Sequence, residues 1–388
     1  MKFETLKIPD NRLSPLVPAK YSCGCSDPGN MNSDADEAQA PPYITGYIKT
    51  DSVKIPVVST LLSTRDKWET LKARISSFRM SFSVKPGLYA AGGPDENSDV
   101  FVTSNYKMSF DTVRSSLDGL NAWILVLDTN GINVWCAAGK GTFGTSELIN
   151  RISKSKLAEH VSHRKIILPQ LGAPGVDSGE VKRRSGFRVM YGPVRAEDLG
   201  KYIAGDYKCD EEMRRVRFDI IDRLILTPIE LRQVFLKFHY FALLVLIFFG
   251  LTPEGIIFSD SIFKGYIFLA AGLLAIFTGA FFTPVFLPFI PFRSFALKGW
   301  VAGIVLFTGA LYITGAYEMY NIFLVVSAMI LFPFLSSYMA LQFTGASTYT
   351  SLSGVKREIK IAFPVYICGA VLSFIFLIIY KIADWGMI

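Results

Sequence analysis

The C-terminal part of this 388-residue chain has very few charged residues. Charged side chains make up 19% of the whole chain, and nearly all of them lie before residue 233. A soluble domain needs a charged surface, so the part after residue 233 is not expected to be one. It contains five apolar segments, at about 236–252, 262–283, 299–317, 320–343 and 361–380. Most of these approach the roughly 20 residues that cross a bilayer, so we predict a soluble domain followed by a membrane domain.

Cysteines are also few, and they are scattered. There are five, an odd number at wide spacing, which excludes a disulfide framework and favours a reducing compartment. No region groups enough of them to hold an iron–sulfur cluster, so we expect none in this chain. Cys23 and Cys25 form a C-x-C pair in an irregular lead-in rich in Pro, Ser, Asp and Asn. The pair could bind a soft metal or serve redox chemistry, but it lacks the four ligands of a structural zinc site; two exposed thiols are the alternative.

The surplus of basic residues is concentrated just before the first apolar segment. The net charge is +7, and this region contains Arg214, Arg215, Arg217, Arg223, Arg232 and Lys237. Their position indicates membrane topology and contact with anionic lipid, and it argues against nucleic acid as a partner. The loops between the later segments alternate between acidic and basic. Together with a polar N-terminus that contains no signal peptide, this predicts a multi-pass protein of the inner (cytoplasmic) membrane, with the soluble domain in the cytoplasm and the C-terminus outside.

Short apolar strands and amphipathic helices alternate in the soluble domain. Strands are predicted at 55–60, 87–90, 100–104, 122–128, 165–168 and 187–191, and helices at 66–78, 109–117, 146–160, 177–184 and 196–203. The first of these helices has Trp68, Leu71 and Ile75 on one face. The alternation is typical of a doubly wound, Rossmann-like α/β domain, whose mostly parallel sheet is covered on both faces. We therefore predict a lead-in (1–42), this α/β domain (43–210), a basic juxtamembrane linker (211–235) and an all-α transmembrane domain of five helices (236–388).

One cysteine lies where a sheet of this kind binds its ligands. The predicted strand at 122–128 ends in an acid, and Asn133–Thr145 follows it before the next helix. Open α/β sheets bind ligands at the carboxyl ends of their strands. Cys136 is expected in a short helical turn capped by Asn133, where free N–H groups, the helix dipole and nearby Lys140 favour a thiolate. Such a thiolate could ligate a metal or act as a nucleophile; the alternative is a small buried core residue, as most free cysteines are.

The same stretch contains a glycine pattern typical of dinucleotide sites. Gly139, Gly141 and Gly144 form G-x-G-x-x-G after a strand and before a helix. The acid that binds the ribose should end the next strand, but no carboxylate follows Lys165–Leu168 at that place. The loop before the first glycine is also too long, and the glycines do not fit a Walker A motif. The missing acid, the long loop and the lack of Walker A spacing therefore argue against nucleotide binding.

Several stretches of the chain resemble the mercury-methylating corrinoid proteins. The most specific is the cap-helix motif Asn-Val-Trp-Cys-Ala-Ala-Gly-Lys at 133–140; the others lie at 86–90, 102–107, 168–175, 191–195 and 345–355. The soluble part is also distantly similar to the corrinoid-binding domain of the corrinoid iron–sulfur protein large subunit, which lacks a membrane part. A corrinoid domain joined to five spans is the architecture of the mercury methylators. The resemblance covers about residues 45–388 and does not reach Cys23 and Cys25.

This resemblance implies a cofactor site around Cys136. The family binds a cobalt corrinoid whose nucleotide base is displaced from the metal, so Cys136 is expected to be the catalytic residue and the lower axial cobalt ligand. Asn133 would cap the turn, and Trp135 would pack against the neighbouring layer. The other expected cofactor contacts lie on the cap helix, after the strand at 100–104 and in two glycine-containing loops: Asn133, Val134, Trp135, Ala137, Ala138, Gly139, Asn105, Tyr106, Lys107, Gly172, Gly175 and Gly192.

The implied function is a corrinoid-dependent methyltransferase that converts Hg(II) to methylmercury. A strongly donating thiolate ligand favours release of a methyl carbanion or radical equivalent, for which the soft electrophile Hg(II) is a suitable acceptor. The resemblance also implies an electron donor, a ferredoxin-like protein with two 4Fe–4S clusters, and a methyl donor, a methylated folate or its carrier protein. Two alternatives stay open: a membrane-anchored corrinoid methyl carrier for one-carbon or acetyl-CoA-type metabolism, and a transporter regulated by the soluble domain. Spans with almost no charged residues argue against the transporter.

Overall fold

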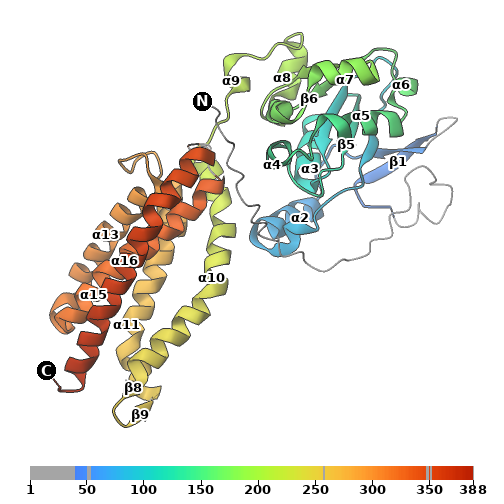
Figure 1. Cartoon of the computed structure of the whole chain (residues 1–388). Helices are drawn as coiled ribbons and strands as arrows, with labels where there is room; N and C mark the ends of the chain where they lie inside the picture. Colours follow the sequence, from blue (N-terminus) through green and yellow to red (C-terminus); the bar gives the residue numbers. More distant parts are fainter. Residues whose placement is uncertain (1–39, 50–53, 257, 347–348, 350–351, 388) are drawn as a thin grey trace, which may run out of the picture.

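The computed structural model describes residues 40–49, 54–256, 258–346, 349 and 352–387, which form an α/β domain followed by a bundle of long helices (Figure 1). Cys23 and Cys25 lie outside the described residues, so their role stays a prediction. The fold class expected from the sequence is confirmed in both parts: a sheet with helices in the N-terminal part, and five long apolar helices in the C-terminal part.

A seven-stranded sheet forms the centre of the α/β domain, in the order β1-β2-β3-β5-β4-β6-β7. The strands are β1 (Ile44–Lys49), β2 (Lys54–Val58), β3 (Gly87–Ala91), β4 (Val100–Ser104), β5 (Ala122–Leu127), β6 (Lys165–Leu168) and β7 (Arg188–Tyr191). Four neighbouring pairs are parallel, and two pairs, β1/β2 and β3/β5, are antiparallel. The sheet is therefore mostly parallel, as predicted, although the sequence predicts neither β1 nor the reversed direction of β3.

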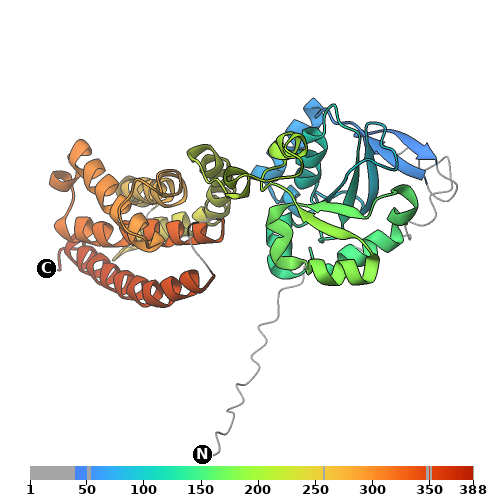
Figure 2. The same ribbon diagram turned by 90° about the horizontal axis from the view of Figure 1, so that it is seen from above.

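Helices cover both faces of this sheet (Figure 2). Every residue of β4 and β5 is buried, because these strands lie near the middle of the sheet and alternate side chains point to opposite faces. Leu125 belongs to the core beneath α5 and α7, whereas Ile124 belongs to the core beneath α3 and α8. The helical elements of this domain are α2 (Thr64–Ile75), η1 (Ser77–Met80), α3 (Lys107–Ser116), α4 (Val134–Lys140), α5 (Thr145–Lys154), α6 (Leu157–His160), η2 (Gln170–Gly175), α7 (Ser178–Ser185), η3 (Ala196–Asp198), α8 (Leu199–Ala204) and α9 (Glu211–Arg214).

The helix α2 differs from its prediction in length and in orientation. It begins two residues earlier than predicted, because Ser63 caps it through the backbone N–H of Asp66, and it ends at Ile75. Its buried residues are Asp66 and Ala73. The apolar side chains Trp68, Leu71 and Ile75 are exposed by 66%, 47% and 43%. The apolar stripe of α2 therefore faces away from the domain, in contrast to an ordinary surface helix.

Five helices of the C-terminal part are long and apolar enough to cross a membrane. They are α10 (Ile220–Gly250), α11 (Phe258–Ile276) with its extension through the π-helical η4 (Phe277–Phe282) into α12 (Thr283–Val285), α13 (Phe295–Thr314), α15 (Ile322–Gln342) and α16 (Leu352–Asp384). The connecting elements are β8 (Leu251–Thr252), β9 (Gly255–Ile256), α14 (Ala316–Met319) and η5 (Phe343–Ala346). Five spans are thus confirmed by length and composition, whereas their direction across the membrane stays a prediction.

The two parts of the chain contact each other along α10. This helix is continuous from Ile220, so the second half of the predicted linker at 211–235 and the first predicted span form one helix. The helix α2 packs beside α10 (Figure 1). In the first turn of α10, Asp222 Oδ2 accepts a hydrogen bond of 2.6 Å from Nη2 of Arg195, which immediately precedes η3. The α/β domain is therefore attached to α10 at two places.

Candidate functional site

The turn that carries Cys136 has the geometry predicted from the sequence. Asn133 is the N-cap of α4, and its Oδ1 accepts a 2.9 Å hydrogen bond from the backbone N–H of Cys136. Gly141 ends the helix in the left-handed conformation, with φ of 80°. Cys136 is a free, exposed cysteine at the carboxyl edge of the sheet, directly after β5. The alternative that Cys136 is a buried core residue is therefore wrong.

The remaining residues of α4 divide between the core and the surface. Val134, Ala137 and Ala138 are buried in the core under the sheet, so they hold the turn in place. Trp135 is partly exposed, and it lines a cavity beside the turn. Gly139 is exposed on the outer side of the helix. The short helix thus presents Trp135, Cys136 and Gly139 outward while its other face anchors it.

Asn105 fixes the loop between β5 and α4. Its side-chain Oδ1 accepts hydrogen bonds from the N–H of Thr129 at 3.0 Å, the hydroxyl of Thr129 at 2.8 Å and the N–H of Gly131 at 3.0 Å. Its Nδ2 donates to Asp128 Oδ1 at 3.3 Å. Gly131 adopts a positive φ of 69°, which glycine does without steric cost, so the chain can turn at this position. Asn105, predicted as a cofactor contact, thus positions the loop that leads to Cys136.

Tyr106 and Lys107 follow β4 at the same edge of the sheet, but they point toward α2 and η1. The Tyr106 ring packs edge-on against Phe82, and the Lys107 ammonium is buried between Asp66 Oδ1 at 2.8 Å and Asp111 Oδ2 at 2.7 Å. Neither residue lines the cavity described below. Lys107 therefore connects α2 to α3, rather than extending toward Cys136.

Arg114 completes this ion-pair cluster. It contacts Asp66 Oδ2 at 3.0 Å and Asp111 Oδ1 at 2.8 Å, and its side chain is fully buried. Burial acts to raise the pKa of Asp66, but hydrogen bonds from Lys107 and Ser63 outweigh it and hold that pKa well below its usual range. For Asp111 the effect of burial is larger than that of its two cations, so its pKa is raised. The cluster of Asp66, Lys107, Asp111 and Arg114 is a structural feature of the domain, outside the cavity.

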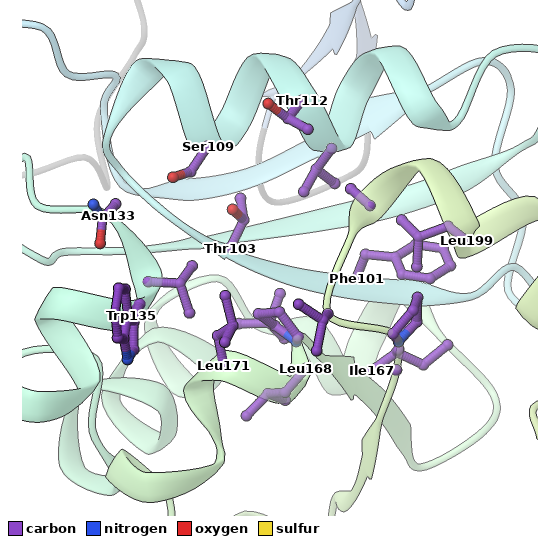
Figure 3. Close-up of a pocket in the computed structure, with 18 residues that line it drawn as sticks. Phe101, Thr103, Ser109, Thr112, Asn133, Trp135, Ile167, Leu168, Leu171 and Leu199 are labelled. Carbon is purple, nitrogen blue, oxygen red and sulfur yellow. The ribbon is translucent and has the colours of Figure 1, made fainter. Parts of the chain in front are cut away.

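A cavity of about 310 Å³ lies next to α4 at the carboxyl ends of β4 and β6 (Figure 3). Its walls are mainly apolar, and the polar groups facing it come from Thr103, Ser109, Thr112 and Asn133. The apolar lining residues are Phe101, Val102, Val113, Val134, Trp135, Ile167, Leu168, Pro169, Leu171, Gly192, Pro193, Val194, Ala196 and Leu199. Cys136 is not part of the lining; it follows the lining residue Trp135 in the sequence, and its side chain is exposed.

Sequence reasoning missed most of this lining. Of the predicted site residues, Asn133, Val134, Trp135 and Gly192 line the cavity. Thr103 and Ser109 were identifiable by position alone. Thr103 lies at the carboxyl end of β4, and Ser109 lies in the first turn of α3, the helix that follows. The residues of η3 and α8 follow a strand through a loop, and only the folded chain brings them to the cavity.

Gly172 and Gly175 are required by packing within the chain. A Cβ atom at Gly172 would lie 2.5 Å from Cε1 of Phe143. At Gly175 it would overlap the carbonyl oxygen of Phe143 and lie 3.1 Å from Cα of Ala138. Both glycines therefore let η2 pack closely against α4 and the residues after it. The prediction that Gly172 and Gly175 contact the cofactor is not needed to explain them, because Phe143 and Ala138 occupy the space beside them, and neither glycine lines the cavity.

Replacing Gly175 with alanine should destabilise the α/β domain, because η2 and the Cys136 turn would have to move apart. We expect a loss of about 1–3 kcal/mol, as for other overpacked sites. Thermal unfolding of the full chain measures it. The matched control is Gly139→Ala, because a Cβ there meets no atom within 4 Å and alanine is favoured over glycine inside a helix by roughly 0.5–1 kcal/mol. An unfolding temperature of Gly175→Ala equal to that of the unmodified chain would contradict this packing argument.

In comparisons with known proteins, this domain is similar to subunits of CO dehydrogenase/acetyl-CoA synthase and of the acetyl-CoA decarbonylase/synthase complex. Residues 62–203 match the family described as CO dehydrogenase/acetyl-CoA synthase delta subunit. The acetyl-CoA decarbonylase/synthase complex subunit gamma of Methanocaldococcus jannaschii is 33% identical over 127 residues, which are 32% of this chain and 26% of that protein. The subunit gamma of Archaeoglobus fulgidus is 34% identical over 118 residues (30% and 25%), and subunit gamma 2 of Methanosarcina thermophila is 35% identical over 120 residues (30% and 25%).

The chain thus covers about a quarter of the length of these relatives. The family match begins just before α2 and ends within α8, so it includes the Cys136 turn and the whole cavity lining, and it leaves out all five long helices. Residues 62–203 therefore form a domain similar to the CO dehydrogenase/acetyl-CoA synthase delta subunit family.

Proposed function

We propose that the α/β domain binds a cobalt corrinoid through the Cys136 thiolate and that the chain is a methyltransferase whose methyl acceptor is Hg(II). The observation that carries the proposal is the position of Cys136: an exposed free thiol on a turn at the carboxyl edge of the sheet, directly beside an apolar cavity. The similarity to subunits of the acetyl-CoA decarbonylase/synthase complex supports a role in the transfer of one-carbon groups.

The residues around Cys136 fit a cofactor of this kind. A thiolate is a soft ligand suited to a transition metal in a site with little other protein ligation. Among the described residues, no group of three or more His, Cys, Asp or Glu side chains could hold a metal ion. A cavity of about 310 Å³ lies at the small end of ligand pockets, so it would take only part of a corrinoid. Asn133, Val134 and Trp135 would hold that part, and Cys136 lies outside the lining with its side chain exposed.

When bound, a cobalt corrinoid supplies the methyl-transfer chemistry, and the identity of its axial ligand is the protein's main influence on it. The chain's own residues hold the turn that carries Cys136 in place. Asn133 caps the turn at the Cys136 N–H, and Asn105 fixes the loop before it through three accepted hydrogen bonds. Trp135, the residue before Cys136, forms part of the wall of the adjacent cavity. A strongly donating sulfur ligand suits an electrophilic acceptor such as Hg(II).

A second candidate function is a membrane-anchored corrinoid methyl carrier for acetyl-CoA-type metabolism. The names of the relatives favour it, since each is a subunit of an acetyl-CoA decarbonylase/synthase complex. Methyl-acceptor assays with Hg(II) and with an acetyl-CoA synthesis system separate the two. For either function we propose a ferredoxin-like electron donor with two 4Fe–4S clusters and a methylated folate, or its carrier protein, as methyl donor.

The first experiment is cobalt analysis and visible spectroscopy of the purified full chain. The proposal expects cobalt bound to the protein and a spectrum without a coordinated nucleotide base, because the Cys136 sulfur would take the place of that base. The spectrum of Cys136→Ala should differ from it, whereas that of Cys368→Ala should not, since Cys368 lies in α16, in the helical bundle. A histidine or benzimidazole ligand in the spectrum of the unmodified protein would refute the proposed ligand.

A further inference from the structure

The helix α2 is amphipathic, but its apolar side faces outward and a charged residue lies on its inner side. Its inner side carries Asp66 in the buried ion-pair cluster, together with the small residue Ala73. Its outer side carries Trp68, Leu71 and Ile75, which lie at helical spacing on one stripe opposite Asp66. We call these three residues the outer α2 face. A helix that pairs charges inward and exposes a tryptophan and two aliphatic side chains does not owe its pattern to the core of its own domain.

Further exposed apolar side chains lie at both ends of the helix. Leu61, just before α2, is exposed by 70%, and Met80, in η1 just after it, by 81%. The helix α10, which α2 packs beside, also exposes Ile221 and Leu224 in its first turns. An exposed apolar surface that extends over several elements marks an interaction site.

Basic side chains flank the outer α2 face on both sides. At 100° per residue, Lys67 lies to one side of the stripe of Trp68, Leu71 and Ile75, and Arg65 and Lys72 lie to the other. The acidic residues of the helix are turned toward the domain, where Asp66 contacts Lys107. A helix with a Trp-containing apolar stripe between basic residues is typical of one that lies in the interface of an anionic membrane.

The position of α2 in the molecule places this face near the bilayer. In Figure 1, α2 lies beside α10. Among the helices of the α/β domain, α2 lies closest to the bundle of long helices, whereas α7 lies on the far side of the sheet. The helix α10 continues without interruption into its apolar, membrane-spanning half. A segment held against the beginning of a span is held at the level where the span enters the lipid.

We propose that the outer α2 face lies on the lipid surface, with Trp68, Leu71 and Ile75 inserted between the headgroups of the leaflet on the side of the α/β domain. The basic side chains beside it contact anionic headgroups. This contact is a third attachment of the α/β domain, in addition to the packing of α2 on α10 and the Arg195–Asp222 ion pair. It fixes the orientation of the cavity relative to the membrane, because Lys107 joins α2 to α3, whose Ser109 and Thr112 line the cavity.

Photo-crosslinking of the full chain tests this proposal. Benzoylphenylalanine is placed at position 68 or 71, and the protein is reconstituted in vesicles of phosphatidylethanolamine and phosphatidylglycerol. The matched control carries the same group at Lys182, an exposed position on α7. After irradiation, mass spectrometry of the peptides identifies what each position has captured. We expect lipid adducts at 68 and 71 and none at 182.

Three results would overturn the proposal: no lipid adduct at 68 or 71, capture of a second copy of the chain in place of lipid, or, in cells, capture of another protein there in place of lipid. The contribution of charge has its own test. Replacing phosphatidylglycerol by phosphatidylcholine should lower the adduct yield at 68 and 71, as should Lys67→Glu with Lys72→Glu. An unchanged yield in both arms would contradict the contact with anionic headgroups. Equal thermal unfolding of all variants shows that the exposed substitutions leave the fold intact.

Discussion

Replacing Cys136 with alanine should abolish methylmercury formation while the protein still folds and inserts into the membrane. The loss follows from the proposed role of the thiolate, because alanine has no donor atom for cobalt. Folding should persist, since the Cys136 side chain is exposed and the cap of α4 is made by its backbone N–H, which alanine retains. The measurement is methylmercury produced by cells or membranes that contain equal amounts of each protein.

Two other free cysteines provide matched controls for this experiment. Cys209, at the end of the α/β domain, and Cys368, in α16, both lie outside the cavity lining, so their alanine variants should keep full activity. Cobalt analysis of Cys136→Ala then tells whether the thiol binds the cofactor or only tunes it. Full activity of Cys136→Ala would refute the thiolate-ligand proposal, and with it the assignment of Cys136 as the catalytic residue.

The centre of the fold was predictable because buried strands leave a strong signal. The strand β5 is a continuous apolar run that precedes a helical pattern, so a buried strand in a mostly parallel sheet could be predicted there from the sequence. Strand β1 and the reversed β3 were not predictable in the same way. Their direction depends on pairing with strands that are distant in the sequence, which local periodicity does not report.

The orientation of α2 could not be predicted for a related reason. Periodicity identifies an apolar stripe but not what covers it, and the usual assumption is that the core does. Here the inner side is decided by Lys107 and Arg114, which lie more than 40 positions later and pair with Asp66. Nothing within residues 64–75 reveals that pairing. Lys107 was predicted as a cofactor contact because it follows a strand, and the local sequence does not reveal that it pairs with Asp66.

The Cys136 turn was predictable because one short motif determines it. Asn133 and Cys136 are three residues apart, so the cap and the thiol follow from local sequence. The glycines of η2 show the limit of that reasoning. A glycine signals a close approach, but only the folded chain shows that Phe143 is the neighbour of Gly172. The cavity wall from Pro193 to Leu199 left no local signal, because it is assembled from a loop and two short helices.

Replacing Lys107 with methionine should destabilise the α/β domain strongly. Lys107 and Arg114 together balance the charges of Asp66 and Asp111, so the variant leaves two buried carboxylates that share a single cation, Arg114. Breaking a buried ion pair from one side costs about 3–5 kcal/mol. Thermal unfolding of the full chain should show a large decrease in the unfolding temperature. The matched control is Arg65→Ala, which removes an exposed pair with Glu69 and should cost about 0.5 kcal/mol or less.

A double variant separates charge balance from the loss of the lysine side chain itself. Lys107→Met combined with Asp111→Asn leaves Arg114 paired with Asp66, so it should recover part of the stability lost by Lys107→Met alone. The pH dependence gives a second check. Because the pKa of Asp66 is lowered in the folded protein, its ion pairs stabilise the fold above the usual range of an aspartate, about pH 4, and this contribution is lost as the pH falls below it. The difference between the unmodified chain and Lys107→Met should therefore be largest near neutral pH and should shrink on acidification. An equal unfolding temperature at neutral pH would show that the cluster does not hold α2 to α3, and the outer α2 face would then need another support for its orientation.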